Sequence, residues 1–351
     1  MPRALTLKHI EGGKPGQVYY PLQLKQVPKP TPGPHELLVR LSAAALNHRD
    51  LFIRQHLYPG ISFTNPLLAD GYGIVVAAGP QVTRTSLLNR PVLLTPMRGW
   101  ESDPAGPENP RKFSVTGGSK AYDVGTAQDY IVVHEDEGAA LPLTGLTGWR
   151  ALVTKANAAF PGSNVLITGI GGGVALQVLQ FAVAFGSNVF VTSGDQAKID
   201  KAKEMGASGG VNYKSDSWDK ELAALLPKNR PYLDAVIDGA GGKVVGKTVR
   251  LLKPGGVIAQ YGMTVSPKMD WVMQAVLANV ELKGTSMGSR NEFRDMVAFV
   301  KEKKIKPIVS RTVKGLGNLE GIDELFAEMN EGKQFGKLVI EIDDEGASAK
   351  L

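Results

Sequence analysis

The chain has 351 residues and a formal net charge of +6, from 40 Lys and Arg against 34 Asp and Glu. This length predicts two domains, and a mild charge excess without long basic runs argues against a nucleic-acid partner. Cysteine is absent, which excludes disulfides, a thiolate nucleophile and cysteine-ligated zinc.

The first residues carry no pattern of a signal peptide or presequence, and no apolar stretch approaches the roughly 18 residues that a membrane helix needs. We therefore expect a cytoplasmic protein that does not bind to a membrane. From residue 4 to about 146, short strand patterns such as 36–41 and 73–79 alternate with Pro and Gly, which predicts a partly closed β-barrel domain. Residues 99–125 are polar and rich in Gly and Pro, and we expect a long loop there.

A glycine-rich turn follows the apolar run 164–167 and precedes an apolar helical pattern over 176–185. Strand, glycine turn and helix in this order hold a pyrophosphate, because the backbone comes close and free N–H groups face its charge. The alternative is an ordinary tight turn without a ligand. The predicted phosphate-binding residues are Gly169, Gly171, Gly172, Gly173 and Val174.

Around this turn, strand patterns alternate with helical ones, which predicts an α/β doubly wound parallel sheet. Strands are expected from Val165, Val189, Gly210, Leu233, Val257 and Val280, and helices at 176–185, 197–205, 217–226 and 243–252. Two amphipathic segments, 291–303 and 319–330, and a last strand, 337–341, follow. The predicted domains are therefore 147–284, the dinucleotide-binding part, and 1–146 with 285–351.

The second strand of this region favours NADPH over NADH. It ends in Ser193 and Gly194, with no carboxylate at the tip to bind a ribose 2′-hydroxyl. Ser193 and Lys198 offer hydrogen bonds and charge to a 2′-phosphate instead. Asp195 lies close enough to complicate this assignment unless it caps the next helix, and Lys198 is alternatively a solvated helix lysine.

The chain resembles the medium-chain dehydrogenase/reductase superfamily over nearly its whole length. The resemblance is closest to the zinc-independent quinone oxidoreductases and alcohol-dehydrogenase-like reductases. Besides the glycine turn, it rests on ALNHRD (45–50), QHLYPG (55–60), DGYG (70–73), VVAAG (75–79), GLTGWRAL (145–152), AKEMGA (202–207) and LKPGG (252–256).

This resemblance implies a GroES-like substrate domain, a Rossmann domain and an active site between them. The spacing of Gly194, Lys198 and Tyr213 fits the 2′-phosphate site of the quinone-oxidoreductase branch, although Tyr213 alone reads as a strand aromatic. The other cofactor contacts that it implies, or that the ends of later strands predict, are Asn47 and Thr147 at the nicotinamide, Tyr261, Gly262 and Met287 beside it, and Lys337 at the pyrophosphate.

Zinc-dependent members of the superfamily carry a Cys where Asn47 stands, a His-Glu pair near Asp70 and another Cys near Leu143. None of these ligands is present, so we expect no catalytic metal. Asn47 and Tyr58 then remain as hydrogen-bond donors for the oxygen that gains negative charge during hydride transfer. Asn47 is alternatively a helix cap, and Tyr58 an aromatic at the edge of the core.

Such donors suit an enolate or a hydroquinone anion, whose charge is spread, better than a simple alkoxide. We therefore expect an NADPH-dependent reductase of conjugated carbonyls or quinones, with a small-molecule substrate. A reductase or dehydrogenase of simple aldehydes and alcohols and a non-catalytic NADPH-binding protein are the alternatives. The strand pattern at 279–283 favours a homodimer paired across a two-fold axis.

Overall fold

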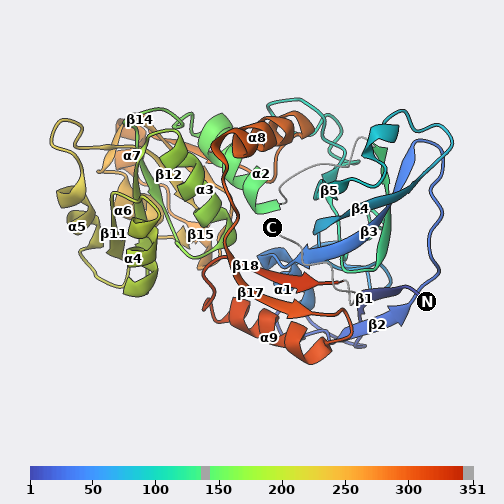
Figure 1. The fold of residues 1–351 in the computed structure, drawn as a ribbon. Coiled ribbons are helices and arrows are strands. Elements are labelled where there is room, and N and C mark those ends of the chain that lie inside the picture. Colours follow the sequence, from blue (N-terminus) through green and yellow to red (C-terminus); the bar gives the residue numbers. More distant parts are fainter. Residues whose placement is uncertain (136–142, 343–351) are drawn as a thin grey trace. The chain divides into compact units, whose positions relative to one another are not determined.

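The computed structural model describes residues 1–135 and 143–342, which fall into two compact units (Figure 1). Unit 1 is the described part of Met1–Leu143, Ser289–Val297 and Val309–Leu351. Unit 2 is Thr144–Gly288 with Ala298–Ile308. Residues 298–308 thus group with unit 2, whereas the sequence assigned all of 285–351 to the first domain.

Unit 2 is built on a six-stranded parallel sheet in the order β11-β10-β9-β12-β14-β16. This is the doubly wound order in which the strand sequence reverses beside the first strand, here between β9 and β12. The strands are β9 (Asn164–Ile167), β10 (Asn188–Ser193), β11 (Gly209–Asn212), β12 (Leu233–Asp238), β14 (Leu252–Gln260) and β16 (Glu281–Gly284). The parallel sheet predicted from the sequence is confirmed; only β14 begins well before its predicted start, because Leu252 already pairs with Leu233.

Helices connect these strands, and a short parallel pair lies beside them. The helices are α2 (Leu143–Trp149), which continues as a π-helix over Arg150–Lys155, α3 (Gly173–Ala184), α4 (Gln196–Glu204), α5 (Trp218–Leu225), α6 (Val244–Thr248) and α7 (Met273–Leu277). The short pair is β13 (Gly241–Gly242) with β15 (Ser266–Met269). Helix α6 is shorter than the predicted 243–252, because the chain turns there into β14. Leu166 of β9, Leu222 of α5 and Val245 of α6 share one buried cluster.

An aromatic cluster explains why residues 298–308 belong to unit 2. Phe299 stacks on Phe185 with ring centroids 4.3 Å apart, and it also packs against Trp149 at 5.3 Å. Gln180 of α3 donates a hydrogen bond to the backbone carbonyl of Lys306 at 2.8 Å. The amphipathic pattern predicted near 291–303 forms α8 (Arg290–Lys303), and its apolar positions thus fix the second half of that helix to unit 2.

Unit 1 centres on β3 (Glu36–Ala45), which pairs antiparallel with β4 (Asp70–Ala78), β8 (Tyr130–His134) and β18 (Lys337–Glu341). The sheet also contains β5 (Pro91–Leu93) and β17 (Val309–Lys314), and β1 (Arg3–Leu7) pairs separately with β2 (Leu22–Gln26). At the end of β3, Ala45 lies opposite both Val339 of β18 and Asp70 of β4. This register brings residues from three distant parts of the sequence to one point.

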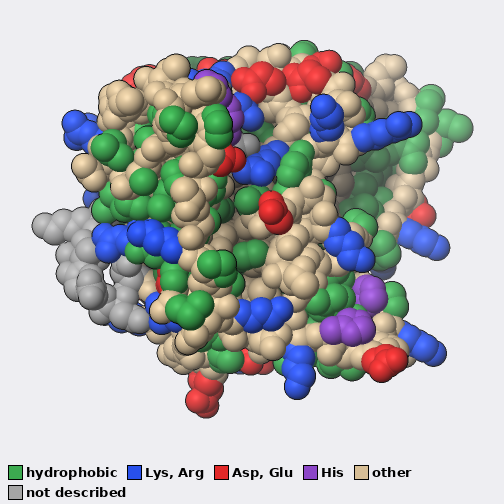
Figure 2. All heavy atoms as spheres, turned by 90° about the vertical axis from the view of Figure 1, so that its right-hand side faces the viewer, with side chains coloured by type: hydrophobic (Ala, Val, Ile, Leu, Met, Phe, Trp, Pro, Cys, Tyr) green, Lys and Arg blue, Asp and Glu red, His purple; other side chains and the backbone are tan. Residues whose placement is uncertain are grey.

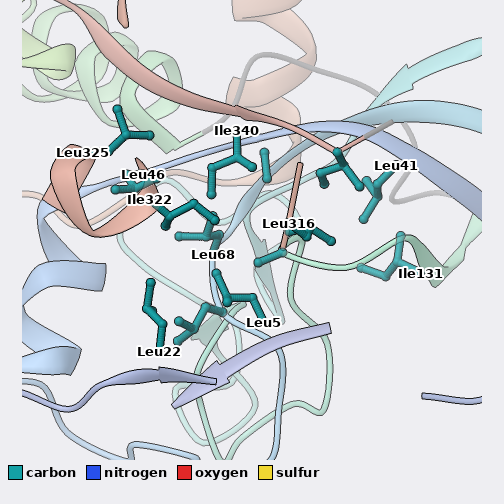
Figure 3. Packing of buried hydrophobic residues seen from close by; sticks show 14 of the residues in the cluster. Leu5, Leu22, Leu41, Leu46, Leu68, Ile131, Leu316, Ile322, Leu325 and Ile340 are labelled. Atoms are coloured by element: carbon teal, nitrogen blue, oxygen red, sulfur yellow. The ribbon is translucent and has the colours of Figure 1, made fainter. Parts of the chain in front are cut away.

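The core of unit 1 joins these strands to two helices, α1 (His48–Arg54) and α9 (Leu319–Asn330). Figure 3 shows Leu5 and Leu22 from the first two strands with Ile322 and Leu325 of α9 and Ile340 of β18 in one cluster. The N-terminal and C-terminal segments of the chain therefore share a single core, which confirms that the chain returns to its first domain.

Within the predicted loop at 99–125, a short strand is present that the sequence did not indicate. Ser114–Val115 (β7) pairs with Met97–Arg98 (β6), and Trp100 at the start of the loop is buried against Phe113. In the described part of the chain, no helix is long and apolar enough to cross a membrane. On the face in Figure 2, Lys and Arg side chains are dispersed among other residues and form no continuous basic patch.

Candidate active site

The glycine turn joins β9 to α3 in a conformation that needs glycine. Gly169 has φ 65° and Gly171 has φ 117°, a region that side-chain-bearing residues seldom adopt. The turn is fixed to β10, because the Ile170 N–H donates to the Thr192 carbonyl at 2.9 Å and the Gly169 N–H to Thr192 Oγ1 at 3.2 Å. Gly172 is the N-cap of α3, so the first N–H groups of this helix are available to an anion.

At the tips of β10 and β11, the predicted 2′-phosphate residues meet. The Tyr213 N–H donates to the Ser193 carbonyl at 3.1 Å, and a Cβ added to Gly194 would lie 2.8 Å from Tyr213 Oη. Half of Tyr213 is exposed, at 49%, so its hydroxyl borders the space above Gly194 instead of lying in the strand core. Lys198 lies half-buried in the first part of α4.

Asp195 caps α4, since its carboxylate accepts the Ala197 N–H at 2.9 Å. This confirms the alternative that Asp195 caps the helix. The Asp195 N–H in turn donates to Ser193 Oγ at 3.1 Å, which leaves the Ser193 hydroxyl proton for another acceptor.

Lys214 is a residue that the sequence reasoning missed. A Cβ on Gly194 would lie 2.9 Å from Lys214 Cε, so this side chain crosses the same small space as the Tyr213 hydroxyl. Lys214 directly follows the aromatic residue that the spacing had singled out. Its position next to Tyr213 in the sequence was the signal that could have identified it.

At the ends of β12 and β14, buried polar contacts shape the next part of the sheet edge. Thr168 Oγ1 donates to Asp238 Oδ1 at 2.5 Å, and Asp238 Oδ2 accepts the Gly241 N–H at 2.9 Å. The Tyr261 ring lies on Gly239, where an added Cβ would be 2.5 Å from its hydroxyl oxygen. Burial, and to a smaller degree the charge of Asp238, raises the pKa of the Tyr261 phenol. Tyr261 therefore stays a neutral donor.

The remaining predicted cofactor residues of unit 2 are Gly262, Thr147 and Met287. A Cβ on Gly262 would lie 3.4 Å from the Gly239 carbonyl, so the β12 and β14 ends approach closely. Thr147 and Met287 are both buried, and Thr147 Oγ1 lies 3.7 Å from Met287 Sδ. The structure thus brings these two residues, which are far apart in the sequence, into contact.

In unit 1, the side chain of Lys337 ends among three oxygen atoms. Its Nζ donates to Asn47 Oδ1 at 2.7 Å, to Asp70 Oδ2 at 2.8 Å and to the Leu46 carbonyl at 2.8 Å. The pair is buried, with 12% of the Lys337 side chain and 1% of the Asp70 side chain exposed. We call this arrangement the Lys337 tripod; each N–H of the ammonium has one acceptor.

The Lys337 tripod fixes the orientation of the Asn47 amide. An ammonium can only donate, so the atom facing it must be Oδ1, and Nδ2 must point the other way. Asn47 is 5% exposed, and its Nδ2 has no acceptor among the residues that the structure describes. A buried donor without a partner costs about 1–3 kcal/mol, and a ligand oxygen would remove that cost.

Asn47 is also the N-cap of α1 and forms a capping box with Asp50, which confirms the helix-cap alternative. Its N–H donates to Asp50 Oδ2 at 2.8 Å, while Arg49 Nη1 binds Asp50 Oδ1 at 3.0 Å in a buried ion pair. Burial raises the pKa of Asp50 to about 6, against the opposing effect of Arg49. Burial and the charge of Lys337 lower the pKa of His48, so this imidazole is neutral at pH 7.

Tyr58 lies at the edge of the unit 1 core. It packs against the hydrophobic cluster, and the Arg49 guanidinium lies over its ring at 5.0 Å from the centroid. The ring is only partly buried. The contacts of the ring match the alternative of a core-edge aromatic and leave the hydroxyl as a candidate donor.

Known proteins share both units. Residues 33–143 match the family model of the alcohol dehydrogenase GroES-like domain, and residues 173–302 match that of zinc-binding dehydrogenases. A zinc-type alcohol dehydrogenase-like protein of Leptosphaeria maculans is 59% identical, covering 97% of this chain and 100% of the relative. A zinc-type alcohol dehydrogenase-like protein of Schizosaccharomyces pombe is 32% identical over 88% of this chain and 92% of its own.

Among solved structures, an NAD-dependent alcohol dehydrogenase has a TM-score of 0.83 at 30% identity, covering 97% of this chain and 100% of its own. The chain belongs to the medium-chain dehydrogenase/reductase superfamily. It is an oxidoreductase of the alcohol dehydrogenase-like class, with the predicted Rossmann and GroES-like domains.

These family names imply zinc, and the side chains that the structure describes in unit 1 do not fit it. Over residues 1–135 and 143–342, no group of three or more His, Asp or Glu side chains converges, and the whole sequence has no Cys. Asp70 is linked to Asn47 through Lys337, and its Oδ2 already binds the Lys337 ammonium. A second cation at that carboxylate would repel the first.

Proposed function

We propose that the protein is an NADPH-dependent reductase that transfers hydride to conjugated carbonyls or quinones without a zinc ion. The observation that carries this proposal is the buried Asn47 amide, whose Oδ1 is taken by Lys337 and whose Nδ2 has no acceptor in the described part of the chain. It offers a neutral, fixed hydrogen-bond donor for an oxygen that becomes negative during the reaction.

The tips of β10 and β11 support NADPH as the cofactor. Ser193 and Gly194 place no carboxylate there, and Asp195 is used as a helix cap. Tyr213 and Lys214 border the space above Gly194, and Lys198 lies in the first turn of α4. A 2′-phosphate would accept charge-assisted hydrogen bonds from these side chains. The glycine turn before α3 suits the pyrophosphate.

Bound NADPH supplies a hydride to an electrophilic carbon. With an enone, the β-carbon would accept the hydride and gain a C–H bond, the C=C π electrons would move toward the carbonyl, and a proton from solvent would complete the saturated ketone, leaving the cofactor oxidised. The Asn47 Nδ2–H group stabilises the enolate oxygen by donating to it. Thr147 and Met287 are proposed to contact the nicotinamide, with Tyr261 and Gly262 at the neighbouring strand ends.

A single amide donor sets the substrate class. An enolate or hydroquinone anion spreads its charge, so one neutral donor stabilises it adequately, whereas a localised alkoxide needs a stronger electrophile. We expect NADPH oxidation with propenal and cyclohexenone to be faster than with propanal and cyclohexanone, their saturated counterparts. The measurement uses protein dialysed against a chelator, with its zinc content determined in parallel.

The same panel separates the alternatives. Faster turnover of propanal, or oxidation of simple alcohols, would favour an alcohol dehydrogenase activity, which the names of the relatives suggest. Stoichiometric zinc in active protein would contradict the metal-free reaction. NADPH binding without turnover of any compound, a 1,4-benzoquinone included, would leave a non-catalytic NADPH-binding protein.

A homodimer is proposed from the edge of the unit 2 sheet. Strand β16 has one neighbour, β14, in the described sheet, so its other side presents unpaired backbone groups. Next to it in sequence, α7 exposes apolar side chains, including Leu277 at 76% and Val276 at 54%. A second copy pairing at β16 would cover both features across a two-fold axis.

We therefore expect light scattering to give the mass of two chains for the wild type and of one chain for Val276→Glu with Leu277→Glu. The charges would be buried unpaired in the interface, at a cost of several kcal/mol. Leu225→Glu, an exposed apolar position on α5, serves as the matched control and should remain dimeric. A wild-type mass of one chain would remove the proposal.

A further inference from the structure

The Lys337 tripod is a fully satisfied buried cation beside the candidate oxyanion donor. Three acceptors at 2.7–2.8 Å use all three N–H groups of Nζ, so none is left for another ligand. This differs from the expectation that Lys337 binds the cofactor pyrophosphate, which would require the ammonium to leave the tripod. Lys337 is two residues before Val339, and Asn47 is two residues after Ala45, so the β3–β18 register explains their meeting.

The ammonium acts on the Asn47 amide in two ways. It selects the rotamer state in which Oδ1 faces Nζ, because the flipped amide would place Nδ2–H against an N–H donor. It also draws electron density toward Oδ1 from a distance of 2.7 Å, which makes the N–H groups on Nδ2 stronger donors. Both effects favour a negative oxygen at Nδ2.

Asp70 keeps this cation in place. Its Oδ2 binds Nζ at 2.8 Å, and its Oδ1 accepts the Leu143 N–H at 2.9 Å, so both carboxylate oxygens are held. The carboxylate offsets the desolvation cost of the Lys337 ammonium. Asn47 is the partner that still has a donor, Nδ2, without an acceptor in the described part of the chain.

We propose that Lys337 is a positioning residue that orients and polarises the Asn47 amide, so that an ammonium on the chain supplies the charge that a metal ion supplies in zinc-dependent relatives. The proposal rests on the proposed reductase function. It requires no contact between Lys337 and the substrate, since the ammonium acts through Asn47.

The test is a double-mutant cycle on kcat at saturating NADPH with the enone that the wild type reduces best. We expect Lys337→Met to lower kcat about 10–100-fold, the range seen when a group that orients an active-site ligand is lost. In an Asn47→Ala background, the same substitution should change kcat by no more than about twofold, because the amide through which it acts is gone. The Kd of NADPH should stay within about twofold of the wild-type value when Lys337 alone is replaced.

Two further variants keep the test decisive. Lys337→Met leaves the buried Asp70 unpaired, so Lys337→Met with Asp70→Asn removes both charges and should fold while showing the same loss of kcat. Lys25→Met is the matched control: Lys25 also lies partly buried in unit 1 and donates to a backbone carbonyl, that of Phe63, and its loss should leave kcat unchanged.

The outcomes separate the possible failures. A weaker Kd for NADPH and NADH alike, with kcat retained, would assign Lys337 to the pyrophosphate and overturn the proposal. An undiminished loss of kcat in the Asn47→Ala background would also overturn it, because Lys337 would then act independently of the amide. Wild-type protein that reduces no compound of the panel would instead refute the proposed function, and this proposal with it.

Discussion

Substituting Asn47 by Ala or by Asp should lower kcat for the enone about 10²–10³-fold, the effect of removing one oxyanion donor. Both variants remove the Nδ2–H group, but Asn47→Asp keeps an oxygen for the Lys337 ammonium, whose Nζ lies 2.7 Å from Oδ1. The pair therefore distinguishes the amide as a donor to substrate from the amide as an acceptor for Lys337. Steady-state kinetics and thermal unfolding of both variants provide the measurement.

The control for this prediction is Asn318→Asp. Asn318 caps α9 by accepting the Gly321 N–H at 3.0 Å, a role that Asp fills equally well, so neither kcat nor stability should change. If Asn47→Asp kept the wild-type kcat while Asn47→Ala lost it, the amide would serve the Lys337 tripod alone. Tyr58→Phe should change kcat little if Tyr58 is a core-edge aromatic, and markedly if its hydroxyl is the second donor.

Lys198→Ala should weaken NADPH binding about 10–100-fold and leave NADH binding nearly unchanged. A charge-assisted hydrogen bond to the 2′-phosphate is worth about 1.5–3 kcal/mol, and NADH has no group at that position. Lys214→Ala should act in the same direction, because Lys214 Cε lies beside Gly194 where the Tyr213 hydroxyl also lies. Fluorescence titration with both cofactors gives the two Kd values for each variant.

Lys203→Ala is the matched control for the loss of one positive charge from α4. Lys203 pairs with Asp200 at 3.4 Å near the end of that helix, so its removal should affect neither cofactor. Equal weakening of NADPH and NADH by Lys198→Ala would contradict the phosphate assignment. The solvated-lysine alternative predicts no change with either cofactor.

Much of unit 2 could be predicted because its signals are local. The glycine turn, the short apolar strands and the helical patterns each lie within a few residues, and the doubly wound order follows from their alternation. The 2′-phosphate residues were found through spacing along the chain. Lys214 was missed because the spacing singled out Tyr213 alone, although the two residues are adjacent.

The Lys337 tripod could not be predicted, because it depends on pairing between segments remote in sequence. Lys337 is 290 residues from Asn47 and 267 from Asp70, and only the register of β18 and β4 on β3 brings them together. The end of α8 illustrates the same limit. Its amphipathic pattern predicted a helix, but the packing of Phe299 on Phe185, which assigns residues 298–308 to unit 2, is a tertiary contact.

The Lys337 ammonium is part of the polypeptide, whereas a metal ion has to be taken up from solution. Lys337 Nζ meets its three oxygen acceptors as soon as β18 and β4 have paired with β3, without loading by a metal chaperone or competition among metals. A chelator has no ion to withdraw from this position. Scarcity of zinc would therefore leave the charge beside Asn47 intact in every folded copy.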